Sequence, residues 1–333
     1  MADVRVGLIG VGKHGARYAR HLSTDIPGAR LAGIARRDRA AAQAQAEELG
    51  CRAYDDYHEL IAAPDIDAVA IVVPPTLHPD IVAAAAAARR PFLLEKPAAV
   101  STADGARLLA AVRETGVPAM VAQTLRFNEV VLTLQAALPR LGRLHAMRLS
   151  QRLEPSRPAW IDDPTIAGGG IALHTGVHSF DLARLLSGLE ADRVSCEMTS
   201  VLTRGTEDNF AAVVRFGGGA ILASIAGSRA TASRSGPIEL AGERGQLMAD
   251  HVFGTVTLVE GTTATPLAVP LPVPTVRHTL VAFVDALRRG TAMPIPLEDG
   301  LRAVAIAEAC YRAARTAQVV AVPAIDGSDA GLP

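Results

Sequence analysis

Apolar and amphipathic stretches alternate along the first 122 residues of the chain. The continuously apolar runs are 4–10, 31–35, 68–73, 91–95 and 117–122. The stretches between them with the composition or periodicity of helices are 13–23, 38–50, 78–88 and 101–115. Short apolar strands separated by helices are typical of a parallel sheet that is covered on both faces. We therefore expect residues 1–122 to form one doubly wound α/β domain.

A different pattern begins after about residue 123. Helical patterns near 128–138 and 174–187 flank a polar, proline-containing loop at 154–170. Candidate strands then follow one another directly, at 193–202, 209–216, 219–228, 237–242, 246–250 and 255–259. Two helical stretches come last, at 276–289 and 298–316. This order predicts a second α/β domain over 123–323 with an open, mainly antiparallel sheet, followed by a flexible tail at 324–333.

Composition agrees with two domains and narrows the range of partners. A chain of 333 residues, 49% of them hydrophobic, is too long for one ordinary core. A net charge of −1 leaves no basic field for nucleic acid or an anionic membrane surface. The apolar stretch at 81–88 is far shorter than the roughly 20 residues that cross a bilayer. With no secretory signal pattern and no C-x-x-C spacing, we expect a cytoplasmic protein without a structural zinc site.

The first apolar run leads directly into the sequence GVGKHG at 10–15. This matches G-x-G-x-x-G in the strand–turn–helix context that makes the motif a strong sign of dinucleotide binding. Gly10 permits a tight turn, Gly12 lets the backbone approach a pyrophosphate, and Gly15 lets helix and strand pack closely. We expect Lys13 and His14 to border the same cofactor. The alternative is a tight turn without a ligand.

Two arginines stand where a dinucleotide site usually has its acidic residue. An NAD site commonly has Asp or Glu about 20 residues after the glycines, whereas an Arg accommodates the 2′-phosphate of NADP. The sequence here is IARRD, so Arg36 holds that position, Arg37 follows, and Asp38 is read as a helix N-cap. We therefore predict NADP over NAD. The alternative is that both arginines point into solvent.

The loop PPTLHPD at 74–80 follows the third apolar run. Ligands of doubly wound folds bind at the carboxyl ends of the strands, where this loop is expected. We accordingly place Pro74, Thr76 and His78 near the cofactor, although capping of the next helix is an equal interpretation for His78.

Lys96 is one of only two lysines. The chain has 33 Lys and Arg in total, so 33 − 2 leaves 31 arginines. Lys96 follows the apolar run at 91–95 and stands between Glu95 and Pro97, at the same ligand-binding edge of the expected sheet. A lysine pKa responds to burial and neighbouring charge, whereas arginine keeps its proton at any working pH. We predict that Lys96 is catalytic and that Glu95 borders the cofactor; the alternative is an ordinary surface lysine.

Several motifs together resemble the Gfo/Idh/MocA oxidoreductase family. They are GVGKHG, Arg36-Arg37, EKP at 95–97, LRFN at 125–128 and GGGIALHTGVHSFD at 168–181. The resemblance implies a Rossmann domain joined to an α/β domain that binds substrate and often mediates homodimers or homotetramers. It also implies hydride transfer at a C–OH/C=O centre of a sugar, inositol or related alcohol.

The resemblance also implies residue roles. Lys96 matches the active-site lysine and donates a hydrogen bond to the reacting oxygen, while His178 is the acid/base that exchanges its proton. His174 stands where the family usually has Asp, which on charge alone lowers the Lys96 pKa and alters substrate preference. Substrate-binding residues are then Lys96, Arg126, Asn128, Trp160, His174 and His178.

The spacing of His174, His178 and Asp181 predicts that they share one face of a helix. The three preceding glycines are expected to let this helix approach a ligand closely. Two histidines four residues apart also resemble half of a zinc site, but no HExxH motif accompanies them, and we predict no metal. Asp181 could equally brace the helix rather than act in the site. Trp160 could equally anchor the 154–170 loop rather than stack on a sugar.

The leading hypothesis is therefore an NADP-dependent dehydrogenase or reductase of a polyol or sugar. One alternative is a lyase or glycosidase that uses tightly bound NAD(P) for transient oxidation. Another is a non-catalytic sensor that binds NAD(P) and a sugar. The pairing of Lys96 with His178 argues against the sensor, since a binding protein has no need of proton transfer.

Overall fold

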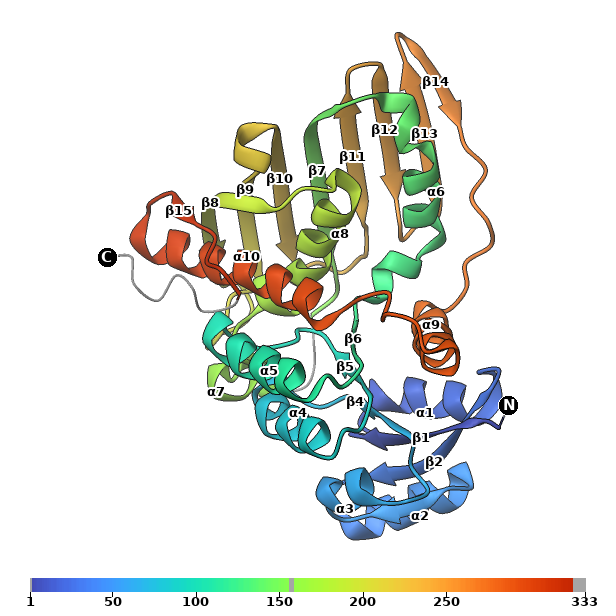
Figure 1. Cartoon of the computed structure of the whole chain (residues 1–333). Helices are drawn as coiled ribbons and strands as arrows, with labels where there is room; N and C mark the ends of the chain where they lie inside the picture. The colour runs from blue at the N-terminus through green and yellow to red at the C-terminus, as the bar shows by residue number, and fades with distance from the viewer. Residues whose placement is uncertain (1, 156–158, 326–333) are drawn as a thin grey trace. The chain divides into compact units, whose positions relative to one another are not determined.

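The computed structural model describes residues 2–155 and 159–325, which form two compact units (Figure 1). Unit 1 comprises the residues up to Ala99, Ala103–Thr124 and Pro274–Leu301. Unit 2 comprises Val100–Thr102, Leu125–Val273 and the residues from Arg302 onward. Residues 274–301, which the sequence placed in the second domain, therefore belong to unit 1. Of the predicted tail at 324–333, residues 326–333 lie outside the described residues.

Unit 1 is built on a six-stranded sheet in which every strand pair is parallel. Its strands are β1 (Val4–Ile9), β2 (Ala29–Ala35), β3 (Arg52–Tyr54), β4 (Ala68–Ile71), β5 (Phe92–Glu95) and β6 (Ala119–Ala122). The spatial order is β3-β2-β1-β4-β5-β6, so the direction of winding reverses between β1 and β4. Ligands of doubly wound sheets bind at this reversal, beyond the carboxyl ends of the strands.

Helices cover this sheet, as its almost wholly buried strands require. They are α1 (Gly15–Thr24), α2 (Arg39–Leu49), α3 (Tyr57–Ala62), η1 (Pro75–Leu77), α4 (His78–Ala87), α5 (Thr102–Thr115) and α9 (Thr275–Arg289). Helix α1 packs against α2 and α9, and α3 packs against α4. The predicted cap is confirmed, because the Asp38 carboxylate accepts a hydrogen bond from the Ala41 amide at 3.1 Å. Strand β3 and helix α3 were not predicted, because they are only three and six residues long.

Unit 2 contains a nine-stranded, mainly antiparallel sheet, as predicted, with one parallel pair formed by β7 and β10. Its strands are β7 (Leu144–Arg152), β8 (Ala191–Thr199), β9 (Asn209–Phe216), β10 (Ile221–Ser228), β11 (Pro237–Gly242), β12 (Gly245–Asp250), β13 (Thr255–Glu260), β14 (Thr263–Pro266) and β15 (Val320–Ala321). Strand β7 was not predicted, because its burial does not alternate regularly, yet it lies near the middle of the sheet.

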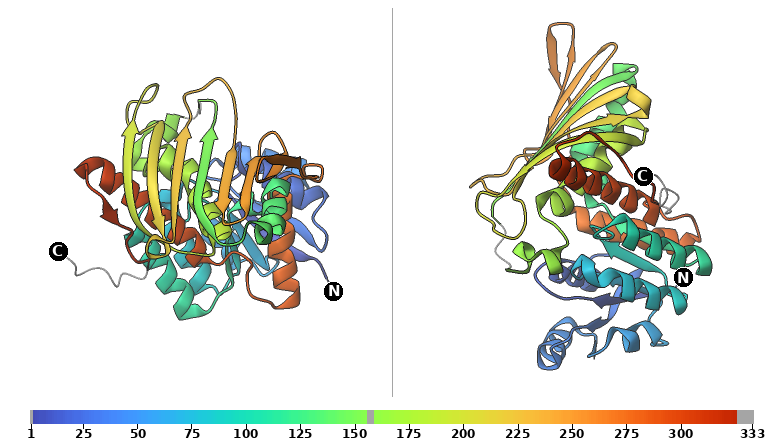
Figure 2. Two further views of the ribbon diagram at one scale, coloured as in Figure 1. Left: turned by 90° about the horizontal axis from the view of Figure 1, so that it is seen from above. Right: turned by 90° about the vertical axis from the view of Figure 1, so that its left-hand side faces the viewer.

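The helices of unit 2 pack on one face of its sheet (Figure 2). The main ones are α6 (Glu129–Ala137), α8 (Val177–Ser187) and α10 (Leu297–Thr316). Shorter turns are η2 (Thr124–Phe127), η3 (Leu138–Leu141), η4 (Ala159–Asp162), α7 (Pro164–Ala167), η5 (Ala172–Gly176) and η6 (Gly217–Gly219). The central strands alternate between core and surface, and Val213, Leu222 and Met248 are about half exposed.

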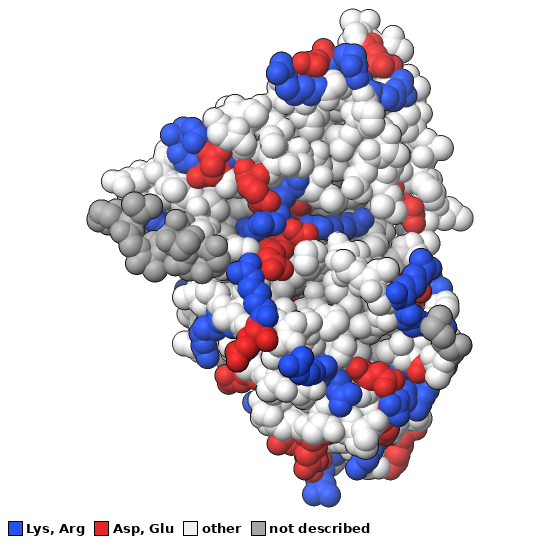
Figure 3. Space-filling model, viewed as in Figure 1, with Lys and Arg blue, Asp and Glu red and all other residues white. Residues whose placement is uncertain are grey.

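The surface carries both signs of charge. On the face shown in Figure 3, Lys and Arg lie interspersed with Asp and Glu rather than gathering into a field of one sign. Within residues 2–155 and 159–325, no helix combines the length and apolar composition that a membrane crossing requires.

Candidate active site

The glycine loop between β1 and α1 has the geometry that its sequence predicts. Gly10 has φ of +93°, and a Cβ atom there would lie 2.2 Å from the Val72 carbonyl oxygen. A Cβ at Gly15 would lie 2.0 Å from the Gly10 oxygen, whereas one at Gly12 would meet nothing within 4 Å. Gly10 and Gly15 are therefore required by the turn itself, while Gly12 leaves space where a pyrophosphate can approach the backbone.

A buried carboxylate joins this loop to the end of β5. Glu95 Oε2 lies 3.3 Å from His14 Nε2 and accepts a hydrogen bond of 2.5 Å from the hydroxyl of fully buried Tyr18. Burial by itself raises the pKa of Glu95, but the interactions with His14, Lys96 and Tyr18 outweigh it and lower the pKa to about 2. Burial and the neighbouring carboxylate raise the pKa of Tyr18. Glu95 thus holds the loop, and sequence reasoning missed Tyr18 because nothing marks it locally.

Lys96 follows β5 directly and so lies beside the glycine loop of unit 1. It is half-buried, and the Lys96–Pro97 peptide bond is cis. Burial lowers the pKa of Lys96, and the charge of Glu95 offsets part of this effect. A lysine at the carboxyl edge of the sheet with a lowered pKa is suited to share a proton or to donate a compact hydrogen bond.

The His78 side chain joins two backbone segments, one after β4 and one after β5. Its Nδ1 lies 3.1 Å from the Ala98 carbonyl oxygen and its Nε2 lies 3.2 Å from that of Val73. His78 is the first residue of α4 rather than its N-cap, and both ring nitrogens face these carbonyls, so the capping interpretation is wrong. Burial lowers the pKa of the fully buried His78. Pro74 and Thr76 belong to the adjoining turn, with Pro74 at the N-cap of η1.

Arg36 and Arg37 come directly after β2 and are both exposed. The Gly10 amide donates to the Ala35 carbonyl at 3.1 Å, which brings the end of β2 to the glycine loop. Arg36 donates to the Gln45 side chain of α2 at 3.2 Å. Two exposed guanidinium groups therefore stand at the edge where the adenosine ribose of a dinucleotide is expected.

In unit 2, Arg126 is engaged by a buried acid. Its guanidinium forms a two-pronged ion pair with Asp181, with Nε–Oδ2 at 2.7 Å and Nη2–Oδ1 at 2.5 Å. Arg184 lies 3.8 Å from the same carboxylate and pairs through two bonds of 2.7 Å with Glu190. Asn128 caps α6 by accepting from the Val130 amide at 3.0 Å. Asp181 therefore braces α8, and Arg126 is held in one orientation.

The segment that carries His174 is a π-helical turn, η5, which precedes α8. His174 lies in this π-helical turn, where regular α-helical spacing does not apply, whereas His178 and Asp181 lie three residues apart on α8. That all three side chains share one face stays a prediction. His174 Nε2 lies 2.9 Å from the Ala167 carbonyl oxygen, and its ring meets the Trp160 ring edge-on with centroids 5.7 Å apart. Turns of this kind often occur at functional sites.

The three glycines before this turn are needed by contacts within the protein. A Cβ atom would lie 2.4 Å from Val100 at Gly168, 2.4 Å from the Tyr311 hydroxyl at Gly169, and 2.0 Å from the Glu207 carbonyl at Gly170. Packing within the protein accounts for all three glycines, and close approach of this helix to a ligand stays a prediction. Glu207 and Tyr311, which contact this backbone, gave no signal in the sequence.

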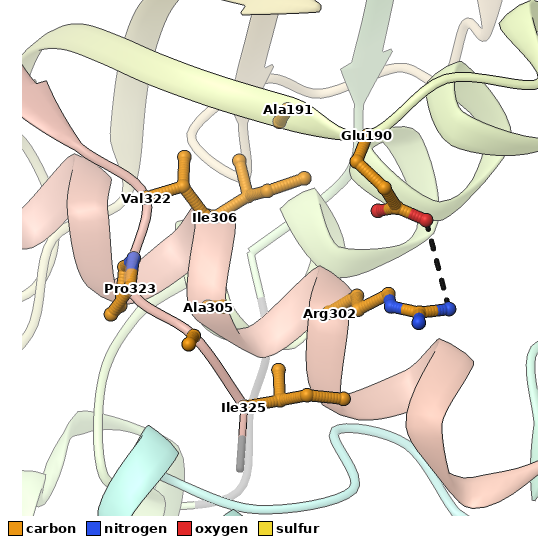
Figure 4. Close-up of a pocket in the computed structure, with 9 residues that line it drawn as sticks. Glu190, Ala191, Arg302, Ala305, Ile306, Val322, Pro323 and Ile325 are labelled. Carbon is orange, nitrogen blue, oxygen red and sulfur yellow. Dashed lines mark ion pairs between the residues drawn. The ribbon is translucent and has the colours of Figure 1, made fainter. Parts of the chain in front are cut away.

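A cavity of unit 2 lies beside α10. It has a volume of about 310 Å³ and is lined mainly by aliphatic side chains of α10 and the segment after β15, with Glu190 and Arg302 paired at 3.6 Å (Figure 4). None of the predicted site residues lines it. Among the described residues, no group of three or more His, Cys, Asp or Glu side chains is arranged to hold a metal ion.

The fold and the glycine loop define an NAD(P)-binding oxidoreductase, and comparison with known proteins identifies its family. Residues 4–123 match the family described as "Oxidoreductase family, NAD-binding Rossmann fold", and residues 137–248 match the "GFO/IDH/MocA C-terminal domain". The chain belongs to the GFO/IDH/MocA family, and this prediction and the predicted fold class are confirmed. It is an NAD(P)-dependent dehydrogenase.

Similar proteins include two curated dehydrogenases. Myo-inositol 2-dehydrogenase of Thermotoga maritima is 30% identical over 77% of this chain and 78% of its own. D-xylose 1-dehydrogenase (NADP(+)) 2 of Haloferax volcanii is 31% identical over 87% of this chain and 91% of its own. The crystal structure of an oxidoreductase domain protein from Kribbella flavida superposes with a TM-score of 0.88 at 23% identity, covering 97% and 100% of the two chains, which supports the fold alone.

Proposed function

We propose that this enzyme transfers hydride between NADP and a C–OH/C=O centre of an inositol, a sugar or a related polyol. In the oxidative direction, the carbon loses hydride to the nicotinamide and the hydroxyl loses a proton, giving a carbonyl and NADPH. The names of the relatives support the substrate class, since one acts on myo-inositol and another on D-xylose.

The observation that carries the cofactor preference is the pair of exposed arginines after β2. A carboxylate there would repel the 2′-phosphate, whereas a guanidinium forms bidentate, charge-assisted hydrogen bonds with it. Arg36 and Arg37 are exposed, and the Gly10–Ala35 hydrogen bond holds their strand against the glycine loop. Lys13 and His14 of that loop, together with Pro74 and Thr76, complete the proposed cofactor site.

In the proposed chemistry, NADP supplies the hydride acceptor and two side chains act on the substrate hydroxyl. His178 takes the proton, because an imidazole exchanges protons near neutral pH. Lys96 donates a hydrogen bond to the same oxygen and stabilises its developing negative charge. Arg126, Asn128, Trp160 and His174 complete the proposed substrate site; of these, Trp160 and His174 already contact each other.

We also propose that the enzyme is a homodimer or homotetramer. Val213 of β9, Leu222 of β10 and Met248 of β12 expose apolar side chains on the sheet of unit 2. A second subunit that pairs with this surface would remove them from water.

A dehydrogenation screen over inositols, pentoses and hexoses, followed by nicotinamide absorbance, tests the function. We expect turnover with a KM for NADP at least about tenfold below that for NAD, because each bond to the 2′-phosphate favours NADP. Arg36→Asp should reverse this order. An NAD preference in the unaltered enzyme would refute the cofactor assignment.

The same assay tests the catalytic pair. Lys96→Arg and His178→Ala should each lower kcat by about 100-fold or more, since each removes one proton-handling group. Arg30→Lys, an exposed change at the surface of unit 1, is the matched control and should retain activity. Unchanged turnover in both catalytic variants would remove the basis of the proposal.

A further inference from the structure

Glu207 and Tyr311 contact the backbone that precedes the π-helical turn. Glu207 lies in the loop before β9, and Tyr311 lies on α10, yet both meet the residues just before His174. The Gly170 amide is 3.0 Å from Glu207 Oε2 and 2.9 Å from Tyr311 Oη. The Ala172 amide donates to Glu207 Oε1 at 2.9 Å, and the Tyr311 hydroxyl donates to the same oxygen at 2.8 Å.

All the groups around the Glu207 carboxylate are donors. Two backbone amides and one phenol point at it, so both of its oxygens act as acceptors. A carboxylate accepts at both oxygens, whereas a carboxamide presents one acceptor and one donor group. The Ile171 amide adds a bond of 3.1 Å to the Glu207 backbone carbonyl. Three consecutive amides, 170 to 172, are therefore fixed by a single residue.

These amides lead directly to the proposed substrate residues. The Gly170 carbonyl accepts a hydrogen bond from the His174 amide at 2.9 Å. The turn η5 runs from Ala172 to Gly176, and α8 begins at the next residue. Gly169 and Gly170 leave room for Tyr311 and Glu207, since a Cβ at either position would overlap them. The two glycines, the Glu207 carboxylate and the Tyr311 phenol thus pack together and determine where the π-helical turn begins.

We propose that Glu207 and Tyr311 are positioning residues that fix the His174–His178 segment and so aim the His178 imidazole at the substrate hydroxyl. This inference rests on the proposed role of His178. Burial raises the pKa of Glu207, and the bonds from Ala172 and Tyr311 offset part of this effect.

Glu207→Gln and Tyr311→Phe test this positioning. Glu207→Gln turns one acceptor into a donor that faces a donor, and Tyr311→Phe removes the bridging hydroxyl. Each should lower kcat on myo-inositol or D-xylose by about 10- to 100-fold, because small displacements of a reacting group are costly. Binding of NADPH, measured by its fluorescence without substrate, should stay within about twofold. Glu197→Gln, an exposed change on β8, is the matched control.

The double variant with His178→Ala separates positioning from general stability. If Glu207 acts through His178, Glu207→Gln adds no further loss of turnover in the His178→Ala background. An equal additional loss in that background, or unchanged kcat in both single variants, would overturn the proposal. A normal rate in His178→Ala alone would instead overturn the proposed function. If Glu207→Gln does not fold, Tyr311→Phe carries the same test.

A measurement without substrate completes the design. The ring signals of His178 in the NMR spectrum, assigned by its substitution, should move in Tyr311→Phe and Glu207→Gln. Those of His58, which is exposed on α3 of unit 1, should not move. Unmoved His178 signals in both variants would contradict the positioning role whichever substrate the enzyme uses.

Discussion

Glu95 is held inside unit 1 by groups from three places in the chain. Tyr18 donates from α1, His14 lies beside it in the glycine loop, and Lys96 adjoins it. A buried carboxylate is stable only when charge and hydrogen bonds compensate for the lost water. The sequence predicted Glu95 as a residue that borders the cofactor, and its contacts show how it links the glycine loop to Lys96.

Glu95→Gln should destabilise the protein in a pH-dependent way. The pKa of Glu95 is lowered from its ordinary value of 4.5 to about 2 in the folded protein, so its stabilisation is present above about pH 4.5 and is lost as pH falls toward 2. Between pH 5.5 and pH 4.0, the stability difference between the unaltered enzyme and the variant should shrink by about 0.8 kcal/mol. Urea unfolding at both pH values measures it.

An exposed glutamate provides the comparison for that experiment. Glu48→Gln, on α2, should leave the free energy of unfolding unchanged at both pH values. A stability difference for Glu95→Gln that stays constant from pH 5.5 to pH 4.0 would show that the carboxylate is not held as described.

At the scale of elements, the β1–α1 turn shows which local features a sequence reveals. The motif GVGKHG predicted a strand, a tight turn and a helix start, because glycine is required where φ is positive or where a Cβ would overlap the backbone. Short elements such as β3 and the π-helical turn η5 were missed, because they last for too few residues to set up a recognisable period.

Alanine substitutions in this turn should separate folding from cofactor binding. Gly12→Ala should fold with an unchanged Tm, since its Cβ meets open space, but weaken NADP binding by about tenfold or more through loss of close backbone approach. Gly10→Ala should lower the Tm strongly, because φ is +93° and the Val72 carbonyl is in the way. Thermal unfolding and NADPH fluorescence give both quantities. Equal effects of the two changes would contradict the geometry.

For the whole molecule, the sheet of unit 2 leads to a prediction about assembly. Leu222 is 54% exposed and Val213 of the neighbouring strand is 50% exposed, and a second subunit packed on this sheet would remove both from water. Light scattering coupled to gel filtration should find a dimer or tetramer. Leu222→Arg should shift it toward monomer with unchanged secondary structure, while Val252→Arg, on the turn after β12, should not. A monomeric unaltered enzyme would refute this.

The sequence alone determined the features that depend on residues close together along the chain, namely most helices and strands and the class of each sheet. The alternation of apolar runs and helices predicted the parallel sheet of unit 1, and the mainly antiparallel sheet of unit 2 followed from successive strands. The residues at strand ends, such as Gly10, Arg36 and Lys96, could be assigned to one edge because all carboxyl ends of a parallel sheet meet there.

Only the tertiary structure decided which polar and charged groups, far apart in the sequence, hydrogen-bond or pair with one another. Glu207 and Gly170 are 37 residues apart, Tyr311 and Gly170 are 141 apart, and Arg126 and Asp181 are 55 apart. No local period encodes such pairings, because a buried acceptor is satisfied by whichever donors the completed fold brings to it. For the same reason, the side chains that pack against the glycines at 168–170 could not be identified from the sequence.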